Sequence, residues 1–275
     1  MSQTFKIAAA ILLSAGISWT GSATPKTSPD VSRTVNRMIA ANGGRAALHK
    51  LGVVKLTVQN EETTSDGKRH VSRDTLYVNL DGLGQMRLEM GNGVVMATSG
   101  QSSWAEIRGQ LDSRRQTPMM VGKTLHTRAF PLLLPFSLEM PGVHVKKIEK
   151  AKFNGKPAKK LLIDFAPGFF LNPILNTTWE VLVRPADGRF LAAQLFPPEK
   201  YRKVMGEGTR YRVLKWHKVG QVELPADILT IGVSGAGEET GHVRTSKITI
   251  DVIGRPSKPL FLSPEKIRAF EEGDI

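Results

Sequence analysis

The spacing of apolar residues first changes close to Val54. Upstream of that point the apolar positions follow the period of about 3.6 residues that an amphipathic helix requires. Ser28 is suited to cap such a helix, Pro29 fits its first turn, and Gly43 with Gly44 ends it. We predict this helix and a short second turn over residues 45–51; the apolar positions of the helix are Val31, Val35, Met38 and Ile39.

From Val54 onward apolar and polar residues alternate with a period of two, which indicates strands with one buried and one wet face. Turn residues at 65–67 and 81–84 separate the first runs. The short, regular spacing predicts a meander of antiparallel strands. The predicted strands lie at residues 54–59, 76–80, 86–90, 94–98 and 103–107.

The middle of the chain has a different pattern. Residues 119–129 have the spacing of a helix, which we expect Pro131 to break. Two dense apolar patches bounded by prolines, at 130–136 and 165–175, fit neither helical nor strand period. We interpret both as loop or lid segments that cover an apolar surface; the lid candidates are Phe130, Leu133, Leu134, Phe136, Phe165, Phe169 and Phe170.

The second half returns to hairpins and ends in a helix. Strands are predicted at 145–151 with 158–165, at 178–184 with 190–196, and at 211–218 with 225–231. A last strand carries Ile248, Ile250 and Val252, and Ser263 is suited to cap a helix over 264–272. No repeat or linker interrupts the pattern. The sequence therefore predicts one mainly β domain of the α+β class, residues 24–275, built on a single antiparallel sheet.

Residues 1–23 have the pattern of a cleaved signal peptide. Lys6 precedes an apolar run from Ile7 to Trp19, and small residues at 21–23 suit a signal peptidase. The alternative is a retained anchor, but the run falls short of the ~20 apolar residues that span a bilayer. We expect export to the periplasm. The sequence contains no cysteine, so the exported domain has no disulfide or lipidated N-terminal cysteine and depends on its buried core for stability.

The chain is strongly basic, with a formal net charge of +13. Its densest group of lysines, between Lys146 and Lys160, flanks the turn residues Asn154 and Gly155, which indicates a solvated hairpin. A second interpretation is attraction to the anionic surface of a membrane. We expect no nucleic-acid partner, because the cations are spread over many segments and export removes that partner.

No local motif predicts catalysis, a metal site or a cofactor. None of the six histidines lies three or four residues from another, as a helical metal pair would require. Ser234 lacks the G-x-S-x-G spacing of a hydrolase elbow, and the glycine pairs have no phosphate-loop continuation. We expect a protein that is not an enzyme. A pair of catalytic carboxylates from distant strands would leave no local motif, so an unrecognised hydrolase is kept as a further hypothesis.

The inward-facing strand residues allow two interpretations. In the first interpretation they form a packed core. In the second they line a cavity, because one amphipathic helix, one broken helix and two apolar patches supply too few residues to cover a long concave sheet. Methionines among them suit a surface that adapts to varied apolar ligands. The cavity candidates are Leu56, Leu76, Val78, Met86, Leu88, Met90, Trp104 and Trp179.

This order of elements resembles the LolA/LolB-like superfamily of bacterial lipoprotein-sorting and lipoprotein-localisation proteins. The resemblance rests on the signal peptide, on the helix ending in residues 38–44 before the strand at 51–59, on the meander, on the midchain insert and on the hairpin at 178–188. It implies an incomplete barrel closed by the N-terminal helix and a midchain lid, with acyl chains bound in the apolar hollow. No polar residue of the family that controls lid opening matches a position here.

The leading functional hypothesis is a periplasmic carrier that binds lipid acyl chains or lipid-modified proteins for transfer between envelope membranes. Its expected partners are the lipid or acylated cargo and, transiently, an anionic membrane surface or a membrane transfer partner. We expect a monomer. The alternative is an envelope regulator or scaffold on the same fold that binds a protein partner instead of a lipid.

Overall fold

The computed structural model describes residues 28–63, 67–100, 102–166, 169, 178–197, 208–234, 238–256 and 259–272. The predicted signal peptide and the lid candidate Phe170 lie outside these residues. The described helices are α1 (Pro29–Ala41), α2 (Arg45–Lys50), α3 (Thr117–Leu132) and α5 (Pro264–Glu272), with a 3-10 turn η1 (Phe136–Glu139).

The strands are β1 (Val53–Thr63), β2 (Arg69–Asn79), β3 (Met86–Met90), β4 (Val94–Thr98), β5 (Ser103–Ile107), β6 (Gln110–Leu111), β7 (Val143–Phe153), β8 (Lys156–Phe165), β9 (Thr178–Val183), β10 (Phe190–Phe196), β11 (Gly208–Val219), β12 (Val222–Val233) and β13 (Glu239–Gly254). They confirm the predicted strands. In the described part of the chain, 13 strands form one sheet in the order β6-β5-β4-β3-β2-β1-β13-β12-β11-β10-β9-β8-β7.

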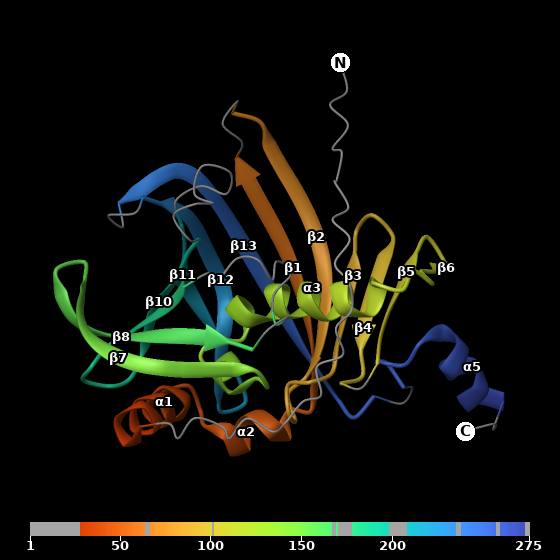
Figure 1. Cartoon of the computed structure of the whole chain (residues 1–275), viewed down its shortest axis with the longest axis horizontal. Coiled ribbons are helices and arrows are strands. Elements are labelled where there is room, and N and C mark those ends of the chain that lie inside the picture. Colours follow the sequence, from red (N-terminus) through yellow and green to blue (C-terminus); the bar gives the residue numbers. More distant parts are fainter. Residues whose placement is uncertain are drawn as a thin grey trace, which may run out of the picture.

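The sheet curves around α3 without closing, which confirms the predicted incomplete barrel (Figure 1). Its two edges, β6 and β7, are far apart in the strand order. The two halves of the meander meet where β1 pairs with β13, with Leu56 opposite Ile250 and Val58 opposite Ile248. This long-range pair makes one continuous concave face from two halves of the chain.

The N-terminal helix α1 forms as predicted. The backbone N–H of Val31 donates to the hydroxyl of Ser28 at 3.4 Å, and Pro29 opens the first turn. Gly43 has a positive φ of 106°, and a side chain there would collide with the main chain of Gln221. The glycine therefore lets the end of α1 approach β12, where the N–H of Glu223 donates to the carbonyl of Asn42 at 3.0 Å.

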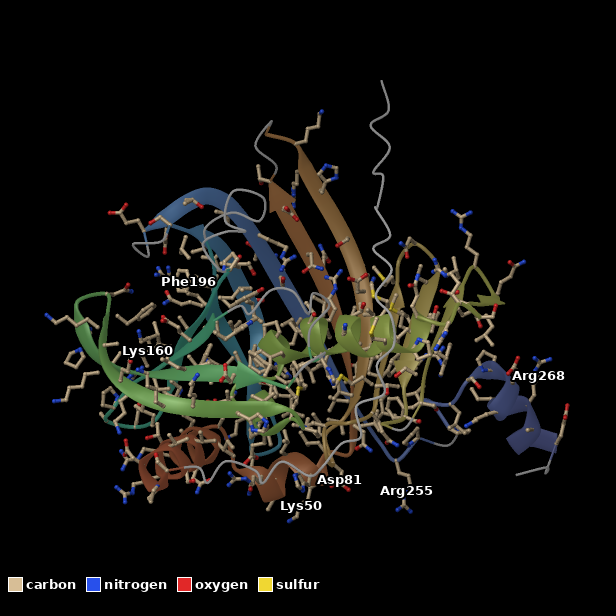
Figure 2. All side chains as sticks on the ribbon, viewed as in Figure 1. Lys50, Asp81, Lys160, Phe196, Arg255 and Arg268 are labelled. Atoms are coloured by element: carbon tan, nitrogen blue, oxygen red, sulfur yellow. The ribbon has the colours of Figure 1, made fainter. Side chains whose placement is uncertain are left out.

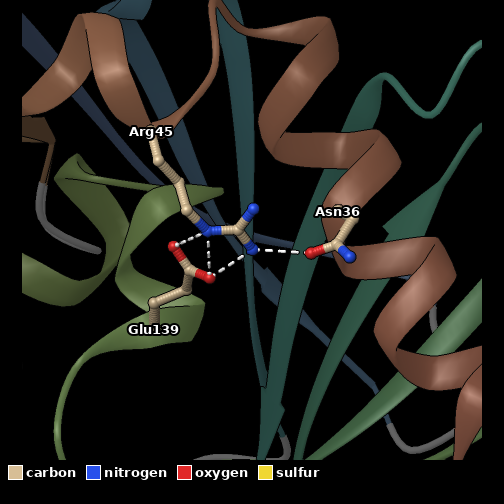
Figure 3. A network of polar contacts seen from close by, with 3 residues as sticks. All are labelled: Asn36, Arg45 and Glu139. Carbon is tan, nitrogen blue, oxygen red and sulfur yellow. Dashed lines mark hydrogen bonds and ion pairs between the residues drawn. The ribbon is translucent and has the colours of Figure 1, made fainter.

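A small polar network holds the helices at this end of the sheet together (Figure 3). The Nε of Arg45, on α2, donates to the carboxylate of Glu139 on η1 at 2.7 and 2.9 Å. Its Nη2 donates to Asn36 on α1 at 2.6 Å. This bidentate pair joins three helical segments from distant parts of the chain.

Helix α3 crosses the concave face and packs against β3, β4 and β5 (Figure 1). The prediction that Pro131 breaks this helix is wrong by one residue, because α3 continues to Leu132 with Pro131 in its last turn. A proline so near the end removes only one intrahelical hydrogen bond, and the N–H of Leu133 still donates to Ala129 at 3.1 Å. No helix in the described ranges is long and apolar enough to cross a membrane.

The basic hairpin β7–β8 turns at Asn154 and Gly155, both with positive φ, as the sequence predicted. Its lysines are partly neutralised: Lys147 and Lys160 contact Glu149 at 2.6 and 3.1 Å. These two lysines hold the pKa of the Glu149 carboxyl below its ordinary value. Charged groups project around the whole molecule rather than from one face, with Lys160 on this hairpin and Arg268 on α5 at opposite ends (Figure 2).

Candidate ligand pocket

A pocket of about 420 Å³ lies between α3 and the concave face of the sheet. Its sheet wall comes mainly from β1, β2, β12 and β13, the strands around the junction of the two halves. The apolar part of the pocket lining is formed by Val58, Leu76, Leu88 and Ile228 of the sheet and by Pro131 and Leu132 of α3. The pocket therefore has an apolar surface beneath α3.

The other part of the wall is polar, and the register of the strands explains why. Residues that pair across antiparallel strands share a face of the sheet. Asn60 pairs with Ser246, and Ser246 pairs with Ile228, so all three face inward. One step further along the strands, Thr230 pairs with Arg244 and also with Tyr211 on β11. The inward face thus changes from apolar to polar at one level across neighbouring strands.

Part of this polar wall is internally hydrogen-bonded. The hydroxyl of Ser246 donates to Oδ1 of Asn60 at 2.7 Å, and Nδ2 of Asn60 donates to Ser72 at 3.4 Å. Arg128, on α3, reaches Asp74 on β2 with 3.9 Å between Nη1 and Oδ2. That distance makes a long ion pair without a hydrogen bond, so most donors of Arg128 stay available at the pocket.

Two buried polar atoms of the pocket wall have no hydrogen-bond partner among the described residues. They are the hydroxyl Oγ1 of Thr230, a residue that is 4% exposed, and Nε of Arg244. Such orphans are rare in folded proteins, because each costs the free energy of its lost hydration.

Tyr211 joins this polar wall to an aromatic cluster. Burial raises the pKa of its phenol, while the nearby charges of Arg244 and Arg128 act in the opposite direction. The phenol is therefore neutral and able to donate at neutral pH. Its ring stacks on Trp179, with ring centroids 5.5 Å apart.

No protein-family model and no curated protein matches the sequence, but solved structures match the fold. A LolA superfamily protein from Nitrosomonas europaea aligns with a TM-score of 0.55 and 10% identity, over 85% of this chain and 98% of that one. The chain has a LolA-like fold.

Two further structures support the LolA-like fold. A DUF1329 family protein from Desulfovibrio piger gives a TM-score of 0.53 at 8% identity, over 86% of this chain and 98% of that one. A domain described as an outer membrane lipoprotein-sorting protein, from Vibrio parahaemolyticus, gives 0.50 at 11%, over 87% and 96%. At these identities the likeness concerns architecture, and it confirms the fold that the sequence resemblance implied.

Within the LolA-like fold, the predicted cavity residues fall into three groups. Leu76 and Leu88 line the pocket. A second group is part of the buried core without lining the pocket, and it consists of Leu56, Val78, Met86, Trp179 and the partly buried Met90. Trp104 lies on the other face, because it pairs with Ala97, which pairs with Arg87. Its indole N–H donates to the carbonyl of Phe261 at 3.1 Å, so it holds the C-terminal segment to the sheet.

The lid candidates lie between α3 and the β8–β9 side of the LolA-like fold. Phe130, Leu133, Leu134 and Phe136 are fully buried. Phe130 packs edge-to-face against Phe165 and Trp179, with centroids 5.3 and 5.0 Å apart. Phe169 stacks on Phe165 at 5.1 Å and on His126 of α3 at 4.2 Å. Three of the lid candidates, Phe130, Phe165 and Phe169, thus form an aromatic cluster with Trp179 and His126 beside the pocket.

Sequence reasoning missed the polar residues of the pocket. Asn60 continues the inward series Val54, Leu56 and Val58, and Ser246 precedes Ile248 in the same phase. A polar residue in phase with a buried series was the available signal. That signal is weak, because polar residues near strand ends normally face solvent. Here α3 encloses Asn60 and Ser246. Among the described residues, no group of three or more acidic or histidine side chains could hold a metal ion.

Proposed function

We propose that the protein is a carrier that holds an acyl chain of a lipid or lipid-modified protein in the pocket beneath α3. The observation that carries this proposal is a pocket of about 420 Å³ with an apolar wall, on the concave face of a LolA-like fold. The volume falls within the ~300–1,000 Å³ range of small-molecule sites. Leu76 and Leu88 are the predicted cavity residues that would contact the chain.

Burial of the acyl chain alone supplies the free energy of such binding. Each methylene moved from water into an apolar site gains ~0.8 kcal/mol. An acyl chain of ordinary length therefore binds well even when part of it stays outside the pocket. Release requires a membrane or partner that offers equal burial, which suits transfer between envelope membranes.

The aromatic cluster beside the pocket would form the gate. Phe165 and Phe169 contact Phe130 and His126 on α3, so separation of these rings would uncover the end of the helix. We propose that the gate opens when these ring contacts with α3 separate.

The proposed site of action is the periplasm, which the signal-like residues 1–23 support. The lysines of the β7–β8 hairpin would favour transient contact with an anionic membrane surface. Part of their charge is offset by Glu149 and Asp164, so the attraction would be weak and reversible. A carrier that must leave each membrane benefits from weak contact.

Native mass spectrometry with lipid extraction tests the proposal on the full chain expressed with its N-terminal segment and purified from the periplasm. We expect acyl species that co-purify with the protein and disappear on extraction with organic solvent. A protein that emerges empty and fails to take up fatty acid from vesicles would refute the carrier function. Recovery of a bound protein in place of lipid would instead favour the regulator or scaffold hypothesis.

A further inference from the structure

The orphaned polar atoms of the pocket need a ligand, and their chemistry specifies which kind. Nε of Arg244 has no hydrogen-bond partner among the described residues, although Glu62 lies opposite Arg244 in register. Thr230 is buried with an unpaired hydroxyl one strand away. A guanidinium has only donors, and a buried donor is stabilised only when an acceptor is supplied.

The strand register places these donors together. Tyr211, Thr230 and Arg244 pair in sequence across β11, β12 and β13, so their side chains stand side by side on the concave face. Arg128 approaches from α3 and lines the same pocket. The pocket lining contains two cations, Arg128 and Arg244. The sole carboxylate among the described lining residues is that of Asp74, which lies 3.9 Å from Arg128. The pocket wall carries a net positive charge at its polar level.

The acceptor that fits is an anionic group with several oxygens. Guanidinium groups bind carboxylates and phosphates through paired, charge-assisted hydrogen bonds. A hydroxyl and a neutral phenol beside them add further donors. The apolar wall formed by Leu76, Leu88 and Ile228 continues directly from this level, so the same ligand needs a hydrocarbon part.

The volume suits a hydrocarbon part of one chain. A volume of about 420 Å³ lies toward the lower end of the ~300–1,000 Å³ range of small-molecule sites. A single chain of medium length with its head group fills this space.

We propose that the pocket binds a single-chain amphiphile whose anionic head group, a carboxylate or phosphate, is held by Arg244, Thr230 and Arg128. The inference deepens the proposed carrier function, on which it rests. It assigns the apolar wall to the chain and the polar level to the head group. It also gives the two orphaned atoms the partners that they lack.

Isothermal titration calorimetry with three probes of equal chain length tests the assignment: dodecanoate, dodecyl phosphate and dodecanol. We expect the wild type to bind an anionic probe at least about tenfold more tightly than dodecanol, since charge-assisted contacts contribute that much. Arg244→Gln should remove this preference and leave the affinity for dodecanol unchanged. The stronger of the two anionic probes identifies the head group as carboxylate or phosphate.

Arg73→Gln is the matched control, because Arg73 lies on β2 beside Asp74, is exposed and points to the opposite face. It changes the net charge equally and should keep the preference. Thr230→Val provides a second variant with little change in volume, and circular dichroism checks that each variant is folded.

The outcomes separate the two proposals. Equal binding of dodecanol and both anions by the wild type, with no effect of Arg244→Gln, overturns the head-group assignment and leaves the carrier function standing. Failure of all three probes to bind refutes the carrier function itself. Inorganic phosphate or acetate binding as tightly as the amphiphiles would show a free-anion site and would overturn the assignment to an amphiphile.

Discussion

Two cavities of similar volume differ in how their polar groups are paired. The pocket beneath α3 has about 420 Å³, and a second cavity beside the β7–β8 turn, here the hairpin cavity, has about 390 Å³. In the hairpin cavity, Lys160 contacts Glu180 at 3.2 Å, Gln194 donates to Glu180 at 3.0 Å, and Arg210 donates to Gln194 at 2.7 Å. In the pocket beneath α3, Oγ1 of Thr230 and Nε of Arg244 have no hydrogen-bond partner among the described residues.

The difference separates a structural cavity from a binding site better than size does. A network whose members satisfy one another stabilises the fold and gains little from a ligand. A wall with orphaned donors is costly until a ligand arrives, so the fold retains free energy that binding recovers. Variants of the two cavities should therefore behave in opposite ways.

The largest contrast should come from blocking each cavity. Thr127→Trp places an indole in the pocket beneath α3, and we expect it to abolish uptake of acyl probes because the space is filled. Ala151→Trp makes the same kind of change in the hairpin cavity and should leave uptake unchanged. Titration with dodecanoate measures both. Equal loss in the two variants would remove the distinction between the cavities.

The next effect concerns stability. Glu180→Gln removes the carboxylate that Lys160 and Gln194 share, and we expect the free energy of unfolding to fall by about 1–3 kcal/mol. Denaturant unfolding measures it. Glu61→Gln, which breaks only the exposed pair with Arg69, should cost less than about 1 kcal/mol. A cost no larger than that of this control would mean that the hairpin network is not structural.

Thr230→Val should have the opposite sign. It removes an unpaired buried hydroxyl, so we expect the ligand-free protein to gain about 1 kcal/mol of stability. Thr249→Val, at an exposed position of β13, is the control and should be close to neutral. Destabilisation by Thr230→Val, measured in the same unfolding experiment, would show that the hydroxyl already has a partner.

The smallest expected effect is a pH dependence on the α3 side. Burial lowers the pKa of His126, although the hydrogen bond to the carbonyl of Phe169 partly opposes this. Because the unfolded state then binds the proton more strongly, stability is full above about pH 6.5 and is lost as the pH falls below that value. Unfolding at about pH 7.5 and about pH 5 should show a loss that His126→Gln reduces.

His144→Gln, an exposed histidine on β7, is the matched control and should not change that dependence. The hairpin cavity should be insensitive over the same range, since Glu149 beside it has a lowered pKa and stays ionised. Hydrogen exchange of β7 and β8 that increased at about pH 5 as much as that of α3 would contradict this contrast.

Local signals predicted most of the fold. The periods of two and of 3.6 gave β4, β5 and α5 at their observed bounds, because each element is determined by neighbours within a few residues. The pairing of β1 with β13 carries no local signal, since any strand with an apolar face could join that edge. The likeness to LolA-like proteins supplied the curvature, which hydrophobic patterns alone do not encode.

The candidate site was predicted only in its apolar part. Leu76 and Leu88 were predicted because they are inward-facing apolar residues of strands, and both line the pocket. The sequence does not distinguish such residues that line a cavity from those that pack in the core. Arg244 and Thr230 were missed because polar residues on strands usually meet water. Their burial depends on α3, which comes from a different part of the chain and packs across the concave face.

The junction between β1 and β13 has a consequence for how the protein matures. Arg244 and Ser246 belong to β13, the last strand in chain order, whereas Asn60 and Val58 belong to β1, the first. The pocket wall is therefore complete only after nearly the whole chain has been synthesised. Pairing across so long a separation is slow relative to the closing of hairpins. Under the proposed carrier function, a partly folded molecule would lack this wall, so cargo would bind only to chains that have finished folding.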